Sequence, residues 1–262
     1  MQSGTTGVGT YDANTTASSW YNVSSTLGCG DANSNVDDVL ICMRTKNITE
    51  IVRAIPVDSS SSTGSAAFWP TIDEVTVFSD YHARSLAGRF IKVPLLIGNT
   101  DYEGGFYATI AAVAGNVLPR AFWETFSDEI FTCPAADRAN VSVSAGLPTW
   151  RYRYFGSFEY LRLTTELDSG AYHASEVPVV FGHLAPDSTE DEIAVGNYMR
   201  GAWAAFAKDP NRGLNNYWWP RYRPGTNSLV RLAFDNLTGA NAALAGKYDG
   251  SCNATFPVGN KG

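Results

Sequence analysis

Residues 94–107, PLLIGNTDYEGGFY, determine how we interpret the rest of this 262-residue chain. An apolar run leads directly into a polar, glycine-rich turn that carries two acids, Asp101 and Glu103. Short apolar runs that end at glycine and asparagine are typical of buried strands. The pattern therefore predicts a strand over residues 90–97, with a carboxylate presented just beyond its end.

A second stretch, residues 172–182, YHASEVPVVFG, contains one of only three histidines in the chain. His173 begins a short loop, and Glu176 follows three residues later. A loop histidine with a carboxylate nearby is where a general base is expected. Because residues 149–158 alternate aromatic and polar side chains, we predict a second strand between the acids and His173. Strand, acid, strand and histidine is the order found in the second half of a serine hydrolase.

A general base at His173 needs a partner that fixes its tautomer and stabilises the imidazolium ion. Asp101 and Glu103 are both candidates, and Glu103 is favoured because the glycines after it let the backbone turn tightly. We expect Glu176 to orient a water or a backbone group near His173 rather than to act as the primary acid. The alternative is that Asp101 and Glu103 are ordinary turn residues and that His173 caps a helix.

Composition limits the range of functions. With 44% hydrophobic residues, the chain is long enough for a substantial core, and we expect a single domain. The formal charge of −7 and the absence of basic runs argue against nucleic acid and anionic membranes as partners. No apolar run is as long as a transmembrane segment, and we expect no transmembrane segment.

The cysteines are interpreted as disulfides, not as a metal site, because metal sites need tighter clusters of Cys or His. Cys29 and Cys42 bracket a short polar loop, and Cys133 is left with Cys252 as its partner. We expect no metal ligands. Six glycosylation sequons begin at Asn14, Asn22, Asn47, Asn140, Asn236 and Asn253. Together with the even number of cysteines they favour a secreted eukaryotic protein.

The start of the chain, residues 1–6, has neither the basic nor the apolar region of a signal peptide. Secretion without such a signal leads us to expect that an N-terminal portion is missing. The chain also contains no Gly-x-Ser-x-Gly sequence, which is the usual turn around a nucleophilic serine. Ser144 has the right residues after it, but Ser142 stands in place of the first glycine. We interpret that stretch as a glycosylated loop.

Helices are expected from periodicity and capping signals, and residues 58–65 read as a flexible exposed loop. The expected helices cover residues 18–27, 36–45, 48–55, 80–87, 104–113, 118–131 and 189–208, the last of them opened by a capping box at residues 189–192, which begins with Thr189. A short strand is expected near residues 229–234.

Six motifs carry a resemblance to a known family. They are MQSG at residues 1–4, LGC at 27–29 with ICMR at 41–44, FWPTID at 68–73, VPLLIG at 93–98 with DYEG at 101–104, AYHASE at 171–176, and WPRY at 219–222. On these motifs the chain resembles the C-terminal half of a type-B carboxylesterase, of the cholinesterase and fungal lipase family. The resemblance is greatest to secreted fungal members and extends over nearly the whole chain.

The resemblance implies an α/β fold: the C-terminal part of an α/β-hydrolase, with about two sheet strands and many helices. Residues 1–262 would form one partial carboxylesterase domain with no second domain. Glu103 and His173 would be the last two members of a Ser-Glu-His triad. Phe106 and Tyr107 would help to line an aromatic substrate gorge.

The resemblance also implies an ester or lipid substrate and no metal or organic cofactor. The serine and the oxyanion-hole amides would belong to a preceding half, which this chain lacks. The chain alone would then be poorly stable, or it would pair with that half, with another polypeptide or with another copy of itself. The alternative is a non-catalytic cholinesterase-like recognition protein, or one that binds esters or lipids. The presence of both Glu103 and His173 argues for the enzyme, and the missing serine motif argues for the alternative.

Overall fold

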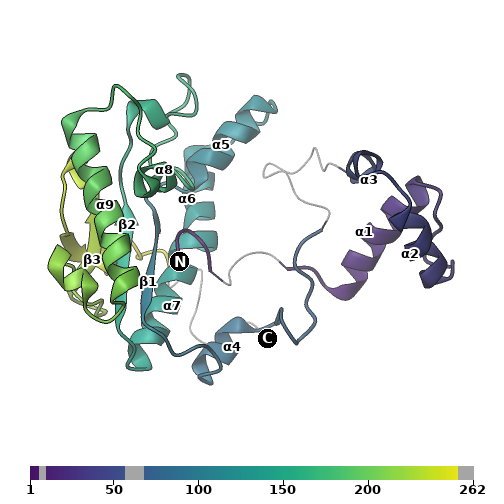
Figure 1. Cartoon of the computed structure of the whole chain (residues 1–262), viewed down its shortest axis with the longest axis horizontal. Coiled ribbons are helices and arrows are strands. Elements are labelled where there is room, and N and C mark those ends of the chain that lie inside the picture. The colour runs from purple at the N-terminus through teal and green to yellow at the C-terminus, as the bar shows by residue number, and fades with distance from the viewer. Residues whose placement is uncertain (6–9, 57–67, 253–262) are drawn as a thin grey trace. The chain divides into compact units, whose positions relative to one another are not determined.

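The computed structural model describes residues 1–5, 10–56 and 68–252. They form two compact units. One unit contains residues 1–5 and 82–252 and holds the sheet, and the other contains residues 10–56 and 68–81 (Figure 1). The loop expected at residues 58–65 lies outside the described residues, as does Asn253. Within the described ranges, no helix has the length and hydropathy needed to cross a membrane.

The sheet has four strands in the order β1-β2-β3-β4. They are β1 (Leu95–Thr100), β2 (Thr149–Tyr154), β3 (Asn227–Leu232) and β4 (Asn241–Leu244). The first three are parallel, and β4 is antiparallel to β3. Because parallel strands end at the same edge of a sheet, the turn after β1 and the loops after β2 meet there. Gln2 forms an isolated parallel bridge with Gly98, which places the start of the chain beside β1.

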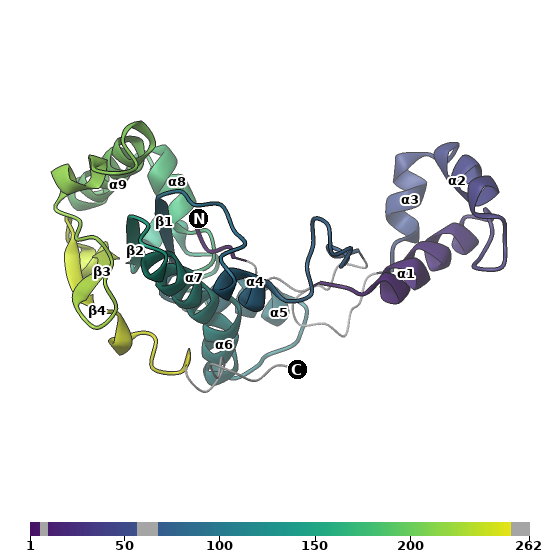
Figure 2. The same ribbon diagram turned by 90° about the horizontal axis from the view of Figure 1, so that it is seen from below.

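The strand β2 lies in the middle of the core, and all six of its residues are buried. Its alternation sends Trp150, Tyr152 and Tyr154 to one face and Arg151 and Arg153 to the other. The aromatic face packs against α8 (Glu176–Phe181) and α9 (Glu190–Lys208). Figures 1 and 2 show these two helices on one side of the sheet. The arginine face lies toward α7 (Cys133–Ser144).

The remaining helices frame these layers or build the second unit. They are α1 (Ala13–Thr26), α2 (Val36–Arg44), α3 (Ile48–Ala54), α4 (Tyr81–Leu86), α5 (Gly104–Val113) and α6 (Arg120–Ser127). Short 3-10 helices cover Glu159–Leu161, Gly213–Tyr217, Phe234–Asn236 and Ala245–Lys247, and a π-helix, η1, covers Asp128–Thr132. The predicted capping box at Thr189 is present, and α9 begins at the next residue. The second unit has its own small core of Val23, Val39 and Met43.

Three expectations about elements were wrong. The first strand begins at Leu95 and continues to Thr100, so it reaches closer to the acids than the apolar run indicated. The stretch around Ser142 is helix α7 rather than a loop, and Ser142 is buried. The sheet has four strands rather than about two: β3 corresponds to the short strand expected near residues 229–234, and β4, only four residues long, was not predicted.

Both predicted disulfides are present. Cys29 is bonded to Cys42 at a sequence separation of 13, and Cys133 to Cys252 at a separation of 119. The first lies within the second unit, and the other closes most of the sheet-containing unit.

Removal of the long-range disulfide should destabilise the sheet-containing unit more than removal of the short one destabilises its own unit. In the chain-entropy model, Cys133→Ser with Cys252→Ser costs about 4–5 kcal/mol, and Cys29→Ser with Cys42→Ser about 3 kcal/mol. Guanidinium unfolding followed by tryptophan fluorescence measures both losses. A smaller loss for the long-range pair would contradict this account.

Candidate active site

Glu103 stands between β1 and α5, with its side chain fully buried. Its Oε1 accepts hydrogen bonds from the Ser3 hydroxyl at 2.5 Å and from the Thr100 amide at 2.6 Å. Its Oε2 lies 2.7 Å from Nδ1 of His173. The turn after β1 therefore holds a carboxylate inside the protein with both oxygens engaged.

His173 follows β2 and is held to Glu103 twice, since its amide also donates to the Glu103 carbonyl at 3.4 Å. The imidazole side chain is 27% exposed. With Nδ1 on Glu103, the other ring nitrogen, Nε2, is left to exchange a proton with a reacting group. This is the arrangement of a general base with its orienting acid.

The charge environment of His173 favours the imidazolium ion. Burial lowers the pKa of His173, but the hydrogen bond that the imidazole donates to Glu103 and the negative charges of Glu103 and Glu176 outweigh this effect. The net result is that the His173 pKa is raised above its ordinary value.

Asp101, the other acid considered for this position, points elsewhere. Its carboxylate Oδ1 accepts from Nε of Arg153 at 2.8 Å. Of the two acids in the turn, the structure therefore brings Glu103 to His173 and pairs Asp101 with an arginine on β2.

Glu176 is the first residue of α8 and is also fully buried. Its Oε1 accepts from Nε2 of Gln2 at 3.5 Å, and Gln2 in turn accepts from the Trp203 indole at 3.2 Å. Burial, followed by the nearby charge of Glu103, raises the pKa of Glu176 to about 7. The side-chain amide of Gln2 is thus one partner of Glu176, and the expected role of Glu176 in orienting a water or a backbone group near His173 stays a prediction.

Aromatic rings surround His173. Phe106 and Tyr107, on the first turn of α5, have ring centroids 6.4 and 5.7 Å from the imidazole. Phe131 is closer, at 4.8 Å, and lies on η1. Phe131 was missed, because the sequence placed it only at the end of an expected helix.

Ser3 was also missed as a site residue. It lies 100 positions before Glu103 and has a positive φ of 44°, with its amide donating to the Gly98 carbonyl at 2.9 Å. The only sequence signal was the MQSG motif, which marked the end of a neighbouring strand rather than a ligand for the acid.

Gly105 allows the start of α5 to pack closely against the loop that leads to His173. A Cβ at this position would lie 2.0 Å from the carbonyl oxygen of Ser169, in the chain that leads to His173. A glycine is therefore required for α5 to begin this close to the histidine loop.

The structure also describes His82 and five of the six sequons. His82 is exposed and 3.3 Å from Asp137. No group of three or more His, Cys, Asp or Glu residues in the described ranges is arranged to hold a metal ion. Among the sequons, Asn14, Asn22, Asn47, Asn140 and Asn236 are exposed.

Comparison with known proteins decides the family. The sequence profile of the Carboxylesterase family matches residues 1–116 and 114–247. The chain belongs to the carboxylesterase family. The resemblance drawn from the six motifs is thereby confirmed.

Individual carboxylesterases agree with this assignment. The chain is 28% identical over 229 residues to a chlorogenic acid esterase of Aspergillus niger, covering 80% of this chain and 43% of that protein. It is 30% identical over 229 residues to Secreted lipase 5 of Gibberella zeae, covering 80% and 41%. The chain therefore spans about two fifths of the length of these relatives.

The fold of this carboxylesterase chain also matches a solved structure, a PNB esterase, with a TM-score of 0.68 at 23% identity. The match covers 88% of this chain and 53% of that one. The expected fold class, part of an α/β-hydrolase with few strands and many helices, is confirmed.

Replacement of Glu176 by Gln should remove a pH-dependent loss of stability. The folded chain keeps the Glu176 carboxyl protonated up to pH of about 7, whereas the unfolded chain releases this proton near pH 4.5. Between these values the folded state binds more protons, so the free energy of unfolding falls as pH rises, by on the order of 3 kcal/mol.

Urea unfolding at pH 5 and pH 8 measures this effect. Glu176→Gln should lose less stability between the two pH values than the unmodified chain, while the exposed control Glu166→Gln should behave like the unmodified chain. Equal pH dependence in all three proteins would refute the assignment.

Proposed function

We propose that this chain supplies the acid and the base of a Ser-Glu-His triad that hydrolyses carboxylic esters. Glu103 is the acid and His173 the base. The observation that carries the proposal is the 2.7 Å contact between the buried carboxylate of Glu103 and Nδ1 of His173. Membership of the carboxylesterase family supports it.

In the proposed reaction, Nε2 of His173 removes the proton from a serine hydroxyl as the serine oxygen attacks the ester carbonyl. Glu103 holds the tautomer and stabilises the imidazolium ion that forms. His173 then donates the proton to the departing alcohol, which leaves an acyl-enzyme. A water, deprotonated in the same way, releases the acid. No metal or organic cofactor takes part in this proposal.

The serine and the oxyanion-hole amides are proposed to come from residues outside this chain, which has no Gly-x-Ser-x-Gly sequence. Exposed apolar side chains on α5, α6 and the loop between them support a polypeptide partner. They include Ile110, Val113, Val117 and Phe122. We propose the N-terminal half of the same enzyme as this partner.

The substrate is proposed to be an ester with an apolar or aromatic part, or a lipid. Phe106, Tyr107 and Phe131 lie around the imidazole and would contact such a group. The names of the relatives, a chlorogenic acid esterase and a secreted lipase, agree with this class. Glu176, buried beside the pair, is proposed to support its charge balance rather than to touch substrate.

Both compact units are proposed to belong to one partial carboxylesterase domain, because the family profile extends across both. Two disulfides and five exposed sequons support a secreted glycoprotein, as does the name of the Gibberella zeae relative.

A second candidate function is non-catalytic recognition or binding of esters or lipids. The lack of a Gly-x-Ser-x-Gly sequence favours it. The buried acid and the paired histidine argue against it, since a binding surface has no need of an acid–base pair.

Hydrolysis of a short-chain p-nitrophenyl ester should appear when this chain is produced together with a family segment that carries Gly-x-Ser-x-Gly. His173→Ala and Glu103→Gln should each reduce the rate by about 10³–10⁴-fold, because a triad member is lost. His183→Gln, a histidine ten residues away, should have little effect.

The chain assayed alone is the informative control. Hydrolysis by the chain alone that disappears in His173→Ala would mean that one of its own serines is the nucleophile, against the proposal. If no activity appears even with the added segment, the recognition function becomes the better explanation.

A further inference from the structure

The turn that carries Glu103, residues 101–103 and here called the acid turn, is anchored at each of its residues. Tyr102 donates its amide to the Ala171 carbonyl at 3.0 Å, which ties the turn to the histidine loop. Asp101 donates its amide to the Tyr154 carbonyl at 2.8 Å, and its carboxylate and its carbonyl both accept from Arg153. The contacts of Arg153 thus lie two residues before Glu103, in the same turn.

The guanidinium of Arg153 donates two hydrogen bonds to Asp101. Its Nε donates to the Asp101 carboxylate at 2.8 Å, and its Nη2 donates to the Asp101 carbonyl at 3.0 Å. Arg153 is 9% exposed, whereas the Asp101 side chain is 40% exposed, so the arginine lies out of water and the carboxylate lies at the surface. A planar guanidinium can satisfy both acceptors at once, which the single ammonium of lysine cannot do with the same geometry.

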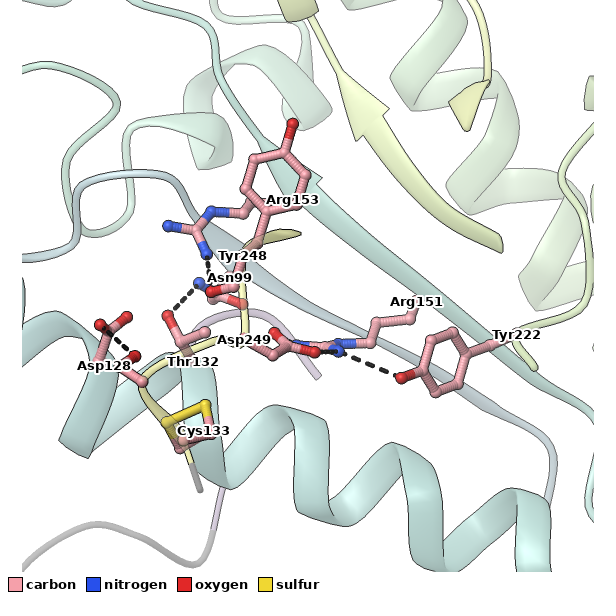
Figure 3. The surroundings of a disulfide bond; sticks show 11 residues. Asn99, Asp128, Thr132, Cys133, Arg151, Arg153, Tyr222, Tyr248 and Asp249 are labelled. Atoms are coloured by element: carbon pink, nitrogen blue, oxygen red, sulfur yellow. Dashed lines mark hydrogen bonds and ion pairs between the residues drawn. A yellow bond between two sulfur atoms is a disulfide. The ribbon is translucent and has the colours of Figure 1, made fainter. Parts of the chain in front are cut away.

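The third donor of Arg153 connects the acid turn to a distant segment. Nη1 of Arg153 donates to the carbonyl of Tyr248 at 3.3 Å, and the Tyr248 ring centroid lies 5.3 Å from the guanidinium (Figure 3). The Tyr248 hydroxyl accepts from Arg231 at 3.1 Å. Tyr248 is thus fixed at its carbonyl, ring and hydroxyl.

Residues 245–252, here called the tail segment, are anchored twice more. Asp249 accepts two bonds from Arg151, at 2.5 and 2.7 Å, and Cys252 is bonded to Cys133 (Figure 3). Arg151 is 1% exposed, so its pairing with Asp249 fixes the segment strongly.

The Cys133–Cys252 disulfide also lies next to a segment that contacts His173. Cys133 follows η1 directly, and η1 carries Phe131, whose ring lies 4.8 Å from His173. Thr132, between them, accepts from the side-chain amide of Asn99 on β1 at 3.2 Å. Single turns of π-helix often occur at functional sites. The Cys133–Cys252 disulfide therefore joins the tail segment to the end of η1, whose Phe131 packs on His173.

We propose that Arg153, held by the tail segment, is a positioning residue that sets Glu103 against His173. The inference rests on the ester hydrolysis proposed above. Arg153 acts through Asp101 and the acid turn and does not touch the reacting atoms. The tail segment and the Cys133–Cys252 disulfide keep Arg153 in place.

The alternative is that Arg153 only stabilises the sheet. The two roles differ in what they do to His173 when the charge of residue 153 is kept, because a weaker contact between Glu103 and His173 then lowers the proton affinity of the imidazole. The chain has three histidines, so their NMR titrations can be followed separately in one sample.

Arg153→Lys is the main test, because it keeps the positive charge and removes the two hydrogen bonds of the guanidinium. We expect the His173 pKa to fall by about 0.5–1 unit, toward its value in Glu103→Gln, with His82 and His183 unchanged. In Arg153→Gln, loss of the positive charge alone would raise the His173 pKa. A fall in that variant would therefore also report altered geometry.

Arg200→Lys is the control, because the Arg200 guanidinium donates to Asn197 within α9 rather than to the acid turn or the tail segment. It should leave the His173 titration unchanged. The double variant Cys133→Ser with Cys252→Ser leaves Arg153 intact and tests the tail segment. It should lower the His173 pKa in the same direction as Arg153→Lys.

An unchanged or raised His173 pKa in folded Arg153→Lys would overturn the proposal. If all three histidines of Arg153→Lys converge on one unfolded value, the disulfide variant decides, and an unchanged His173 there overturns it. Should Glu103→Gln itself leave the His173 pKa unchanged, the acid–base pair and the proposed function fail instead.

Discussion

The structure depends on a carboxylate that has been taken completely out of water. An ionised Glu103 would be costly to bury alone, and it is retained because a hydroxyl, an amide and an imidazole share its two oxygens. These donors come from the first residues of the chain, the end of β1 and the loop after β2. Parallel pairing of the two strands brings the last two of these donors to one edge. The hydrogen bonds of Glu103 therefore require this register of β1 and β2.

The two faces of β2 make different kinds of contact, one apolar and one charged. Trp150, Tyr152 and Tyr154 supply apolar contact area to α8 and α9. Arg151 and Arg153 place charge under α7, and each has an acid partner, Asp249 and Asp101. Removal of one partner from such a pair leaves a buried charge unpaired, whereas a surface pair is worth little. The arginine face is thus intolerant of single changes in a way that the aromatic face is not.

Much of the fold was predictable because the signals were local. The bounds of α5 and α9 followed from an apolar glycine-rich start and from a capping box at Thr189. The pairing of Cys133 with Cys252 followed from elimination. Helix α7 was missed because Pro134 and the sequon resemble loop signals, although proline is well tolerated in a first helical turn.

The candidate site was predictable only in part, for a physical reason. Glu103 and His173 lie in recognisable sequence motifs. The choice between Glu103 and Asp101, however, depends on Arg153 of β2, which pairs with Asp101. Ser3 and Phe131 reach the pair through tertiary packing, which no short window of sequence records. The sequence identified the candidate acid and the candidate base, and the three-dimensional contacts identified the residues that hold them in place.

The bond from Ser3 to Glu103 spans 100 positions, and that from the Trp203 indole to Gln2 spans 201. Contacts so distant in sequence form late, because the chain entropy lost on closing such loops is recovered only when the intervening elements are in place. The acid is therefore expected to gain its full set of donors in the final stage of folding, after β1 and β2 have paired. Local opening at the first residues of the chain would expose Glu103 to water before the sheet itself comes apart.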